Sequence, residues 1–420
     1  MVPLKRVSTV NDDTLSEDTD PELRISYVDI GNVSSDGRIL GDTRYAFEKA
    51  PSRARRLVRH GDVIISTVRT YLKAIAPIID PPDDLVVSTG FAVVRPDPLR
   101  LDPAFCKYAL RTPTFLDEVV RRSTGVSYPA ISASRLIEIP VSLPPLDEQR
   151  AIAADLDRET ARLDALMDAK TRLLERLAAR RQSLVTRAVT RGLDPEAPMK
   201  DSGVKWLGEV PAHWEVVRLR WMLTELGQGW SPSADDRPPS DDQWGVLKLS
   251  AVSGGHYLPQ HAKTLPGDLD PREDLAVRPG DVIVTRANTP ALVGEACYVE
   301  ETPPHLMLSD LMYRLRTRAA RLNGQFLAYV LRTPIGRYQI ERDARGSSRS
   351  MVKISQSHIR DWLVPLPPLP EQEAIVNALA RETASLDALA ATTRQSIERL
   401  GDRRAALIAE TVTGRRRVPV

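Results

Sequence analysis

Arginine side chains cluster beside two loops that contain glycine and serine, one in each half of the sequence. Guanidinium groups bind phosphate oxygens and guanine edges, and glycine allows a backbone to come close to a nucleic acid. The spacing therefore predicts two DNA contacts, although a solvated charged face is the alternative for any single arginine. The residues concerned are Arg121, Arg122, Ser127 and Tyr128 around Gly125, and Arg342, Arg345, Ser347, Ser348, Arg349 and Lys353 around Gly346.

Further candidates lie beside two similar apolar segments, residues 57–69 and 275–288. Each contains a Gly-Asp turn, Gly61-Asp62 or Gly280-Asp281, followed by a run of β-branched residues. Such a run predicts a buried strand, and polar residues at its ends could reach a ligand. We therefore add Arg53, Arg55, Arg56, Arg59, Ser66 and Arg69 in the first half, and Thr285, Arg286 and Asn288 in the second half.

The sequence contains no motif that predicts catalysis. Residues 80–83 read DPPD, which lacks the aromatic residue that follows the prolines in adenine methyltransferases. A phosphate-binding G-x-x-x-x-G-K-[ST] loop is also missing from the sequence, and its six histidines and two cysteines have no zinc-ligand spacing. We expect no catalytic residue, metal site or cofactor site in this chain.

The composition is that of an ordinary globular protein. The 420 residues are 42% hydrophobic and 27% charged, and the net charge is +2. Cys106 and Cys297 make no disulfide framework, which favours a reducing compartment. No apolar run approaches the roughly 20 residues that cross a bilayer, and no secretory signal is evident. We expect a cytoplasmic protein without a membrane partner.

Residues 143–190 recur as residues 366–413 at a constant offset of 223, with 25 of 48 positions identical. Apolar residues in each copy alternate in steps of four and three, which predicts a long amphipathic helix that needs a partner. The other copy is the obvious partner, in an antiparallel coiled coil. The predicted interface comprises Ile152, Leu156, Leu163, Leu166, Leu177 and Leu184, with Ile375, Leu379, Leu386, Leu389, Leu400 and Leu407.

The repeat divides the chain. We expect a globular domain over 1–145, a helix over 146–191, a second globular domain over 192–368, a second helix over 369–414 and a basic tail over 415–420. Paired arginines recur in register at 180–181 and 403–404. Pairing within one helix, or flanking charge in the coiled coil, explains them better than contact with a partner protein.

Two copies of LPPLxEQ, each opening a long helix, resemble the specificity subunit of type I DNA restriction–modification systems. The connector MKDSGVKWLGEVPAHWEV (199–216) resembles the opening of a target recognition domain in that family, and the first domain lacks the full form of this phrase. The resemblance covers residues 1 to about 413. It implies an α+β fold: two mixed α/β target recognition domains, joined by two long antiparallel coiled-coil helices, with a pseudo-two-fold internal repeat.

The resemblance also implies a non-catalytic protein whose two domains each read one half of a split DNA site. The helices would set the spacing and dock two methyltransferase subunits, which motor–nuclease subunits join. S-adenosylmethionine, ATP and Mg would then be used only by those partners. An autonomous DNA methyltransferase or nuclease, and a coiled-coil scaffold without a DNA role, remain the alternatives.

Overall fold

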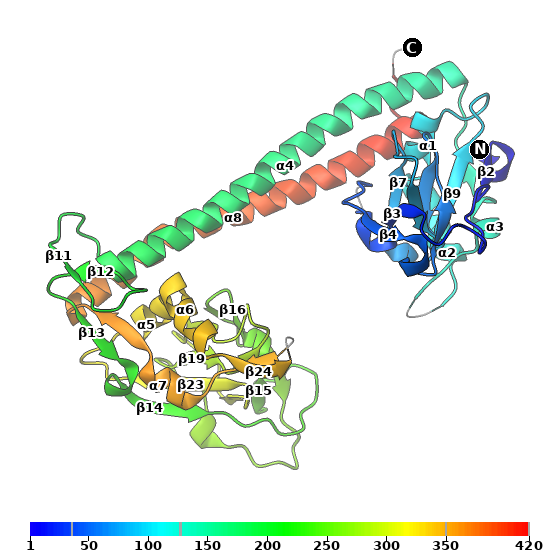
Figure 1. Ribbon diagram of the computed structural model, residues 1–420. Coiled ribbons are helices and arrows are strands. Elements are labelled where there is room, and N and C mark those ends of the chain that lie inside the picture. Colours follow the sequence, from blue (N-terminus) through cyan, green and yellow to red (C-terminus); the bar gives the residue numbers. More distant parts are fainter. Residues whose placement is uncertain (35–36, 126–127, 349–350, 419–420) are drawn as a thin grey trace. The chain divides into compact units, whose positions relative to one another are not determined.

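The computed structural model describes residues 1–34, 37–125, 128–348 and 351–418. The chain forms two compact units. Unit 1 comprises residues 1–172 and 393–420, and unit 2 comprises residues 173–392. Each unit therefore contains one mixed α/β domain together with parts of both long helices (Figure 1).

Unit 1 contains two four-stranded sheets and a short two-stranded one. All pairings are antiparallel except that of β3 with β8. In sheet order, the strands are β2 (Ser8–Val10), β9 (Phe91–Pro96), β6 (Val63–Ser66) and β7 (Ile75–Pro77); β4 (Thr43–Ala46), β3 (Arg24–Val28), β8 (Leu85–Ser88) and β5 (Ala54–Leu57); and β1 (Val2–Pro3) with β10 (Pro140–Val141).

Three short α-helices complete the described part of this domain: α1 (Pro103–Ala109), α2 (Pro113–Arg122) and α3 (Ala133–Leu136). The first begins at the Asp102 cap, whose carboxylate accepts the N–H of Phe105, and Pro103 occupies the first turn. Phe105, Leu110 and Phe115 are buried in the same cluster as the strand residue Val63. The helices therefore cover one face of the β2-β9-β6-β7 sheet.

Unit 2 repeats this plan with more strands. Its sheets, in order, are β14 (Leu223–Gln228), β23 (Met312–Thr317), β19 (Val282–Thr285) and β21 (Ala296–Tyr298); β18 (Ala262–Thr264), β15 (Gly245–Leu247) and β22 (Leu306–Met307); β20 (Ala287–Asn288), β25 (Met351–Lys353) and β24 (Arg345–Ser348); and the pairs β11 (Met199–Asp201) with β12 (Glu209–Pro211), β13 (Glu215–Arg218) with β26 (Leu363–Leu366), and β16 (Val252–Ser253) with β17 (His256–Tyr257). Its short helices are α5 (Gly324–Arg332), α6 (Pro334–Asp343) and α7 (Gln356–Asp361).

The duplication extends to strand register. Val63 of β6 faces Val94 of β9, and Val282 of β19 faces Leu315 of β23 in the equivalent pair. Both central strands are fully buried, as the β-branched runs predicted. The predicted fold class, mixed α/β domains with two long helices and an internal repeat, is confirmed.

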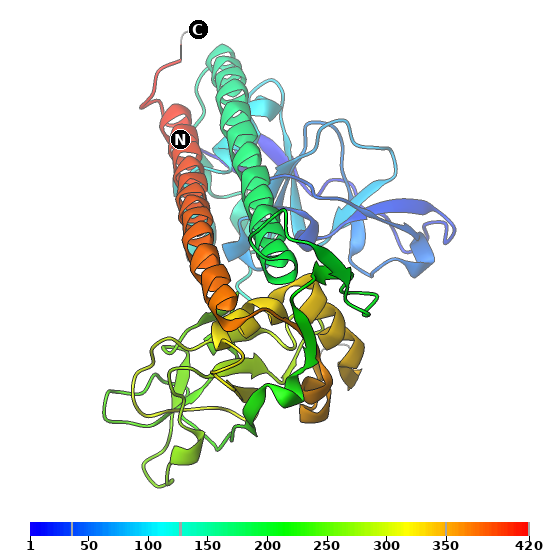
Figure 2. The ribbon, with the colours of Figure 1, turned by 90° about the vertical axis from the view of Figure 1, so that its left-hand side faces the viewer.

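The long helices are α4 (Leu146–Arg191) and α8 (Leu369–Val412). In unit 1 the beginning of α4 contacts the end of α8, and Arg404 donates to Asp164 at 2.9 Å. In unit 2 the end of α4 contacts the beginning of α8, and Arg181 lies 3.2 Å from Asp387. The two ion pairs occupy equivalent positions of the repeat. They show antiparallel pairing within each unit, and both views show the helices side by side (Figures 1 and 2).

These ion pairs revise two details of the predicted interface. Arg181 and Arg404 pair across the helices, so of the two predicted roles they are flanking charges of the coiled coil and not partners within one helix. Leu166 and Leu389 are 46% and 47% exposed, so the structure places them outside the interface. The following residues, Met167 and Ala390, turn inward instead, and one of the two heptad rows therefore lies one residue later than predicted.

The predicted row is the one richer in leucine. The row that faces the partner includes threonines, Thr160 and Thr383, which are buried because their hydroxyls donate to the carbonyls of Leu156 and Leu379. The remaining predicted interface residues are buried or half-buried: Ile152, Leu156, Leu163, Leu177, Leu184, Ile375, Leu379, Leu386, Leu400 and Leu407.

The glutamine of each LPPLxEQ motif fastens a domain to its helix. Gln149 is fully buried, accepts the N–H of Asp102 at 2.8 Å, and donates to the carbonyls of Arg100 and Pro144. Gln372 makes the equivalent three bonds in unit 2. The motif is therefore a structural clamp that ties the cap of a short helix to the start of a long one.

Among the described residues, no helix is both long and apolar enough to cross a lipid bilayer.

Candidate nucleic-acid interface

In unit 1, the end of strand β6 is joined to the loop that follows α2. Val68 forms a bridge with Ala130, and the N–H of Ile131 donates to the carbonyl of Thr67 at 2.8 Å. We call this contact ladder 1. It brings together the two candidate segments of the first half, which are more than 50 residues apart in the sequence.

Unit 2 contains the same arrangement, ladder 2. Ala287 of β20 pairs with Lys353 of β25, and the N–H of Ile354 donates to the carbonyl of Arg286 at 3.0 Å. Strand β25 also pairs with β24, so the arginine-bordered loop is a hairpin that extends the ladder. Each unit thus independently places its strand end against its loop.

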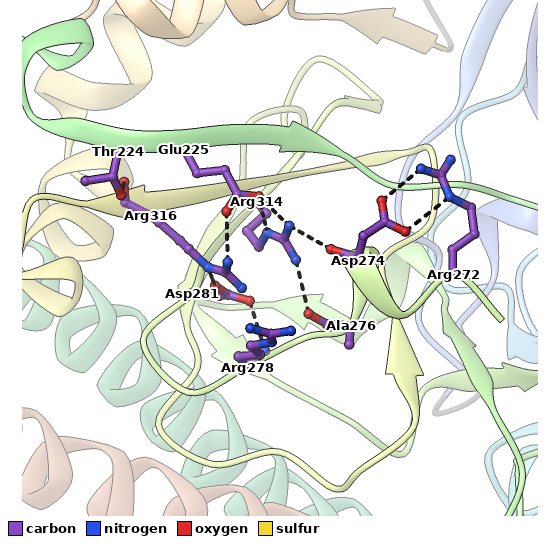
Figure 3. A network of polar contacts seen from close by, with 9 residues as sticks. All are labelled: Thr224, Glu225, Arg272, Asp274, Ala276, Arg278, Asp281, Arg314 and Arg316. Atoms are coloured by element: carbon purple, nitrogen blue, oxygen red, sulfur yellow. Dashed lines mark hydrogen bonds and ion pairs between the residues drawn. The ribbon is translucent and has the colours of Figure 1, made fainter.

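A buried aspartate supports the central strand beside each ladder. In unit 2, Asp281 accepts from the side chain of Arg316 at 2.7 Å and from the backbone N–H of Arg278 at 2.9 Å (Figure 3). In unit 1, Asp62 accepts from Arg95 at 2.9 Å and from the N–H of Arg59 at 2.8 Å. This explains why the Gly-Asp turn recurs: its aspartate caps the turn and binds the neighbouring strand.

Glu225 extends the network in unit 2. It accepts from both Arg314 and Arg316, and the nearly buried Arg314 also donates to the carbonyls of Ala276 and Asp274 at 3.1 and 3.0 Å (Figure 3). Partial burial acts to raise the pKa of Glu225, but the two guanidiniums outweigh burial and the pKa is lowered. In unit 1, a hydrogen bond from Arg95 lowers the pKa of Asp13. Both carboxylates are therefore charged at neutral pH.

Several predicted residues remain available for a ligand. Arg69 is exposed, and its guanidinium carbon lies 5.0 Å from the ring centroid of the exposed Tyr128. Arg345 and Lys353 are exposed on the hairpin of ladder 2, where Arg345 also donates to the carbonyls of Arg342 and Ala344. Asn288 and Arg286 are half-buried beside this hairpin, and Arg286 donates to the carbonyl of Asp310 at 3.3 Å. Arg53 is exposed at the start of β5. The ladders therefore carry positive charge in both units.

Other predicted residues have structural roles. Arg55 stacks over Phe47 at 4.5 Å, and Arg56 donates to Thr14, while its partial burial lowers its pKa. The remaining four arginines are in ion pairs: Arg59 with Asp13, Arg121 and Arg122 with Glu118, and Arg342 with Asp343. These arginines can reach a phosphate only by leaving, or sharing, a protein partner.

The predicted DNA-contact role of Ser66 and Thr285 is wrong. Both are buried at the ends of their strands, and their hydroxyls donate to the carbonyls of Val68 and Leu292. Neither side chain is open to a ligand, because each closes the turn that starts its ladder. Ser127 and Arg349, and the side chains of Ser347 and Ser348, lie outside the described residues.

Comparison with known proteins names the family. Residues 54–176 match the family described as the Type I restriction modification DNA specificity domain. Residues 54–176 of this chain therefore resemble a specificity domain of this family. The match includes strand β6, ladder 1 and the beginning of α4. The family that LPPLxEQ predicted is therefore confirmed.

Two relatives are named specificity subunits. The EcoEI specificity subunit of Escherichia coli is 31% identical over 208 residues, which are 49% of this chain and 35% of that relative. The chain thus spans only about a third of its length. The putative MjaX specificity subunit of Methanocaldococcus jannaschii is 23% identical over 366 residues, covering 85% of this chain and 79% of that protein. The names agree with the prediction of a specificity subunit.

A solved structure shares the fold. It comes from work described as the structural basis of complex assembly and conformational transition of the type I R-M system. Its TM-score is 0.70 and its sequence identity 24%, over 98% of this chain and 96% of that one. The two-domain, two-helix arrangement is therefore known in a solved protein.

Proposed function

We propose that this chain is the DNA-recognition subunit of a type I restriction–modification complex. The observation that carries the proposal is the repeated ladder. Each unit presents one strand end and one loop, fixed by the same backbone bonds and bordered by exposed basic side chains. Phosphate contacts from such side chains position a protein on DNA, and side chains between them read base edges.

The two ladders share a frame but differ in side chains. Arg69 of ladder 1 corresponds to Asn288 of ladder 2, and Tyr128 corresponds to Met351. An arginine is suited to guanine and an asparagine to adenine, so two such surfaces would select different base sequences. We propose that each domain reads one half of a bipartite, asymmetric site in double-stranded DNA.

The helix pair would set the distance between the half-sites. Helices α4 and α8 are continuous and are held by equivalent ion pairs in both units, which supports a stiff connection instead of a flexible linker. Its outer surface would dock two methyltransferase subunits, which in turn join motor–nuclease subunits. S-adenosylmethionine, ATP and Mg would act in those partners.

The experiment is to express the chain with a type I methyltransferase subunit and map methylated adenines by single-molecule sequencing. A split motif with one modified adenine in each half supports the proposal. No methylation with a folded, bound partner would contradict it. Methylation by the chain alone would favour an autonomous enzyme, and the absence of salt-dependent DNA binding by the assembled complex would favour a scaffold.

Shortening the helix pair tests the proposed spacer role. The ion pairs set the antiparallel register within each unit, and counting from them along both helices matches residues 168–174 of α4 with residues 394–400 of α8. Deleting both segments removes one heptad from each helix and keeps the phase. We expect the spacer to shorten by about 3 base pairs, since seven residues rise about 10 Å. An unchanged spacer in the methylation map would contradict the role.

A further inference from the structure

Each ladder carries two exposed, large apolar side chains at equivalent positions. In unit 1 these are Tyr71 and Tyr128, which are 53% and 65% exposed. In unit 2 they are Leu292 and Met351, which are 47% and 46% exposed. We call them tip pair 1 and tip pair 2. The sequence predicted Tyr128 as a DNA contact but not Tyr71, Leu292 or Met351, because apolar residues in a loop do not by themselves indicate a binding surface.

Counting residues from the ladders and from the strands that follow matches the two tip pairs. Tyr128 and Met351 each lie three residues before the isoleucine whose N–H closes the ladder. Tyr71 and Leu292 each lie four residues before the first residue of the next strand, β7 or β21. The repeat thus retains two exposed apolar residues in each unit but changes both from aromatic to aliphatic.

The turn that presents Tyr71 is strained. It is a short 3-10 helix, residues Thr70–Leu72, and the residues on both sides have left-handed backbones: Arg69 with a φ of 52° and Lys73 with a φ of 52°. The equivalent of Lys73 in unit 2 is Gly294, which has a φ of 71°. Glycine adopts this conformation freely and lysine does not. Unit 1 thus carries an exposed lysine at a position where the sister copy carries glycine.

The surroundings point to nucleic acid. Thr70 donates its N–H to the carbonyl of Pro129, which holds the turn against the loop of Tyr128. Exposed Arg69 and Lys73 border tip pair 1, and exposed Arg345 and Lys353 lie on the hairpin that bears Met351. Apolar side chains flanked by cations are complementary to a DNA duplex, in which the bases lie between two rows of phosphates.

We infer that the tip pairs contact the bases of the two half-sites, and that Lys73 contacts a phosphate beside the first. This inference rests on the proposed DNA-recognition function. The tip pairs supply apolar contact with base edges, such as a thymine methyl group, so they contribute to sequence discrimination. Lys73 supplies a positive charge that attracts the phosphates of DNA of any base sequence.

The test compares the whole chain, in complex with its methyltransferase subunit, on two duplexes over a range of salt. One duplex carries the mapped site and the other an unrelated sequence. We expect Tyr71→Ala with Tyr128→Ala to weaken binding to the mapped site at least about tenfold, with little change on the unrelated duplex and an unchanged salt slope. Leu99→Ala, which truncates an 81% exposed side chain elsewhere in unit 1, is the matched control.

Lys73 is tested with two variants. Lys73→Met removes charge and keeps the strain, so it should weaken binding to both duplexes and lower the salt slope by about one, without a gain in melting temperature. Lys73→Gly should weaken binding equally but raise the melting temperature. Equal loss on both duplexes for the tyrosine variant, or no loss, would overturn the base contact. An unchanged slope for both lysine variants would overturn the phosphate contact. If the unmodified complex does not prefer its mapped site, the proposed function itself fails.

Discussion

The two interhelical ion pairs occupy equivalent positions but differ in burial. The side chains of Arg404 and Asp164 are 14% and 27% exposed, and two contacts of 2.9 and 3.3 Å join them. The side chains of Arg181 and Asp387 are 22% and 46% exposed and are joined at 3.2 Å. Removing one partner of a buried pair leaves an uncompensated charge, whereas exposed pairs contribute little.

We therefore expect Asp164→Ala to destabilise the end of α8 by about 2 kcal/mol, reduced from the full cost of a buried pair by partial exposure. Asp387→Ala should cost less than about 1 kcal/mol. The double variant Asp164→Ala with Arg404→Met should recover most of the loss, because the stranded guanidinium is gone. The Asp387→Ala variant is therefore the matched control for Asp164→Ala.

The assay is hydrogen exchange of the backbone amides of residues 400–408 in the whole chain, which reports local opening without requiring two-state unfolding. If Asp164→Ala cost no more than Asp387→Ala, or if the double variant were as unstable as Asp164→Ala alone, a stranded charge would not be the cause of the lost stability. Either result would mean that the pairs contribute through packing alone.

Two further predictions concern stability. Gln149→Leu should destabilise unit 1 by about 3 kcal/mol in urea unfolding, because three hydrogen bonds are lost at a fully buried site; a loss below about 1 kcal/mol would refute the clamp. Because the folded-state pKa of Glu225 is lowered, the stability that its pairing with Arg314 supplies is present above the ordinary pKa of 4.5 and is lost as the pH falls below it. The Glu225→Gln variant should be less stable at pH 7, and its free energy of unfolding should fall less between pH 5 and pH 3. An unchanged fall would refute the stabilising role of the Glu225–Arg314 pair.

The repeat made most of the architecture predictable. Two similar helices in one chain pair with each other, and two similar Gly-Asp turns produce two similar strands. The predicted heptad row was wrong at Leu166 and Leu389. Composition does not show that the hydroxyls of Thr160 and Thr383 donate to backbone carbonyls of their own helices, which allows both threonines to be buried. Only the partner helix decides which stripe turns inward.

The segments that form the candidate interface could be predicted from the sequence, but which of their side chains are open to a ligand could not. The strand ends and the loops were chosen separately, and the structure joins them in both units. Ser66 and Thr285 failed because polar residues at a strand end can close a turn as readily as bind a ligand. Lys73 was not among the predicted residues, because its left-handed backbone conformation cannot be read from the sequence.

The measurement that tests the central claim most directly is an exchange of one domain. Residues 1–142 would be replaced by the corresponding domain of a specificity subunit with a known site, and methylated adenines would be mapped for both proteins with the same methyltransferase subunit. We expect one half of the motif to change to that of the donor, while the other half and the spacer stay as they were. A change in both halves, or in neither, would contradict this expectation.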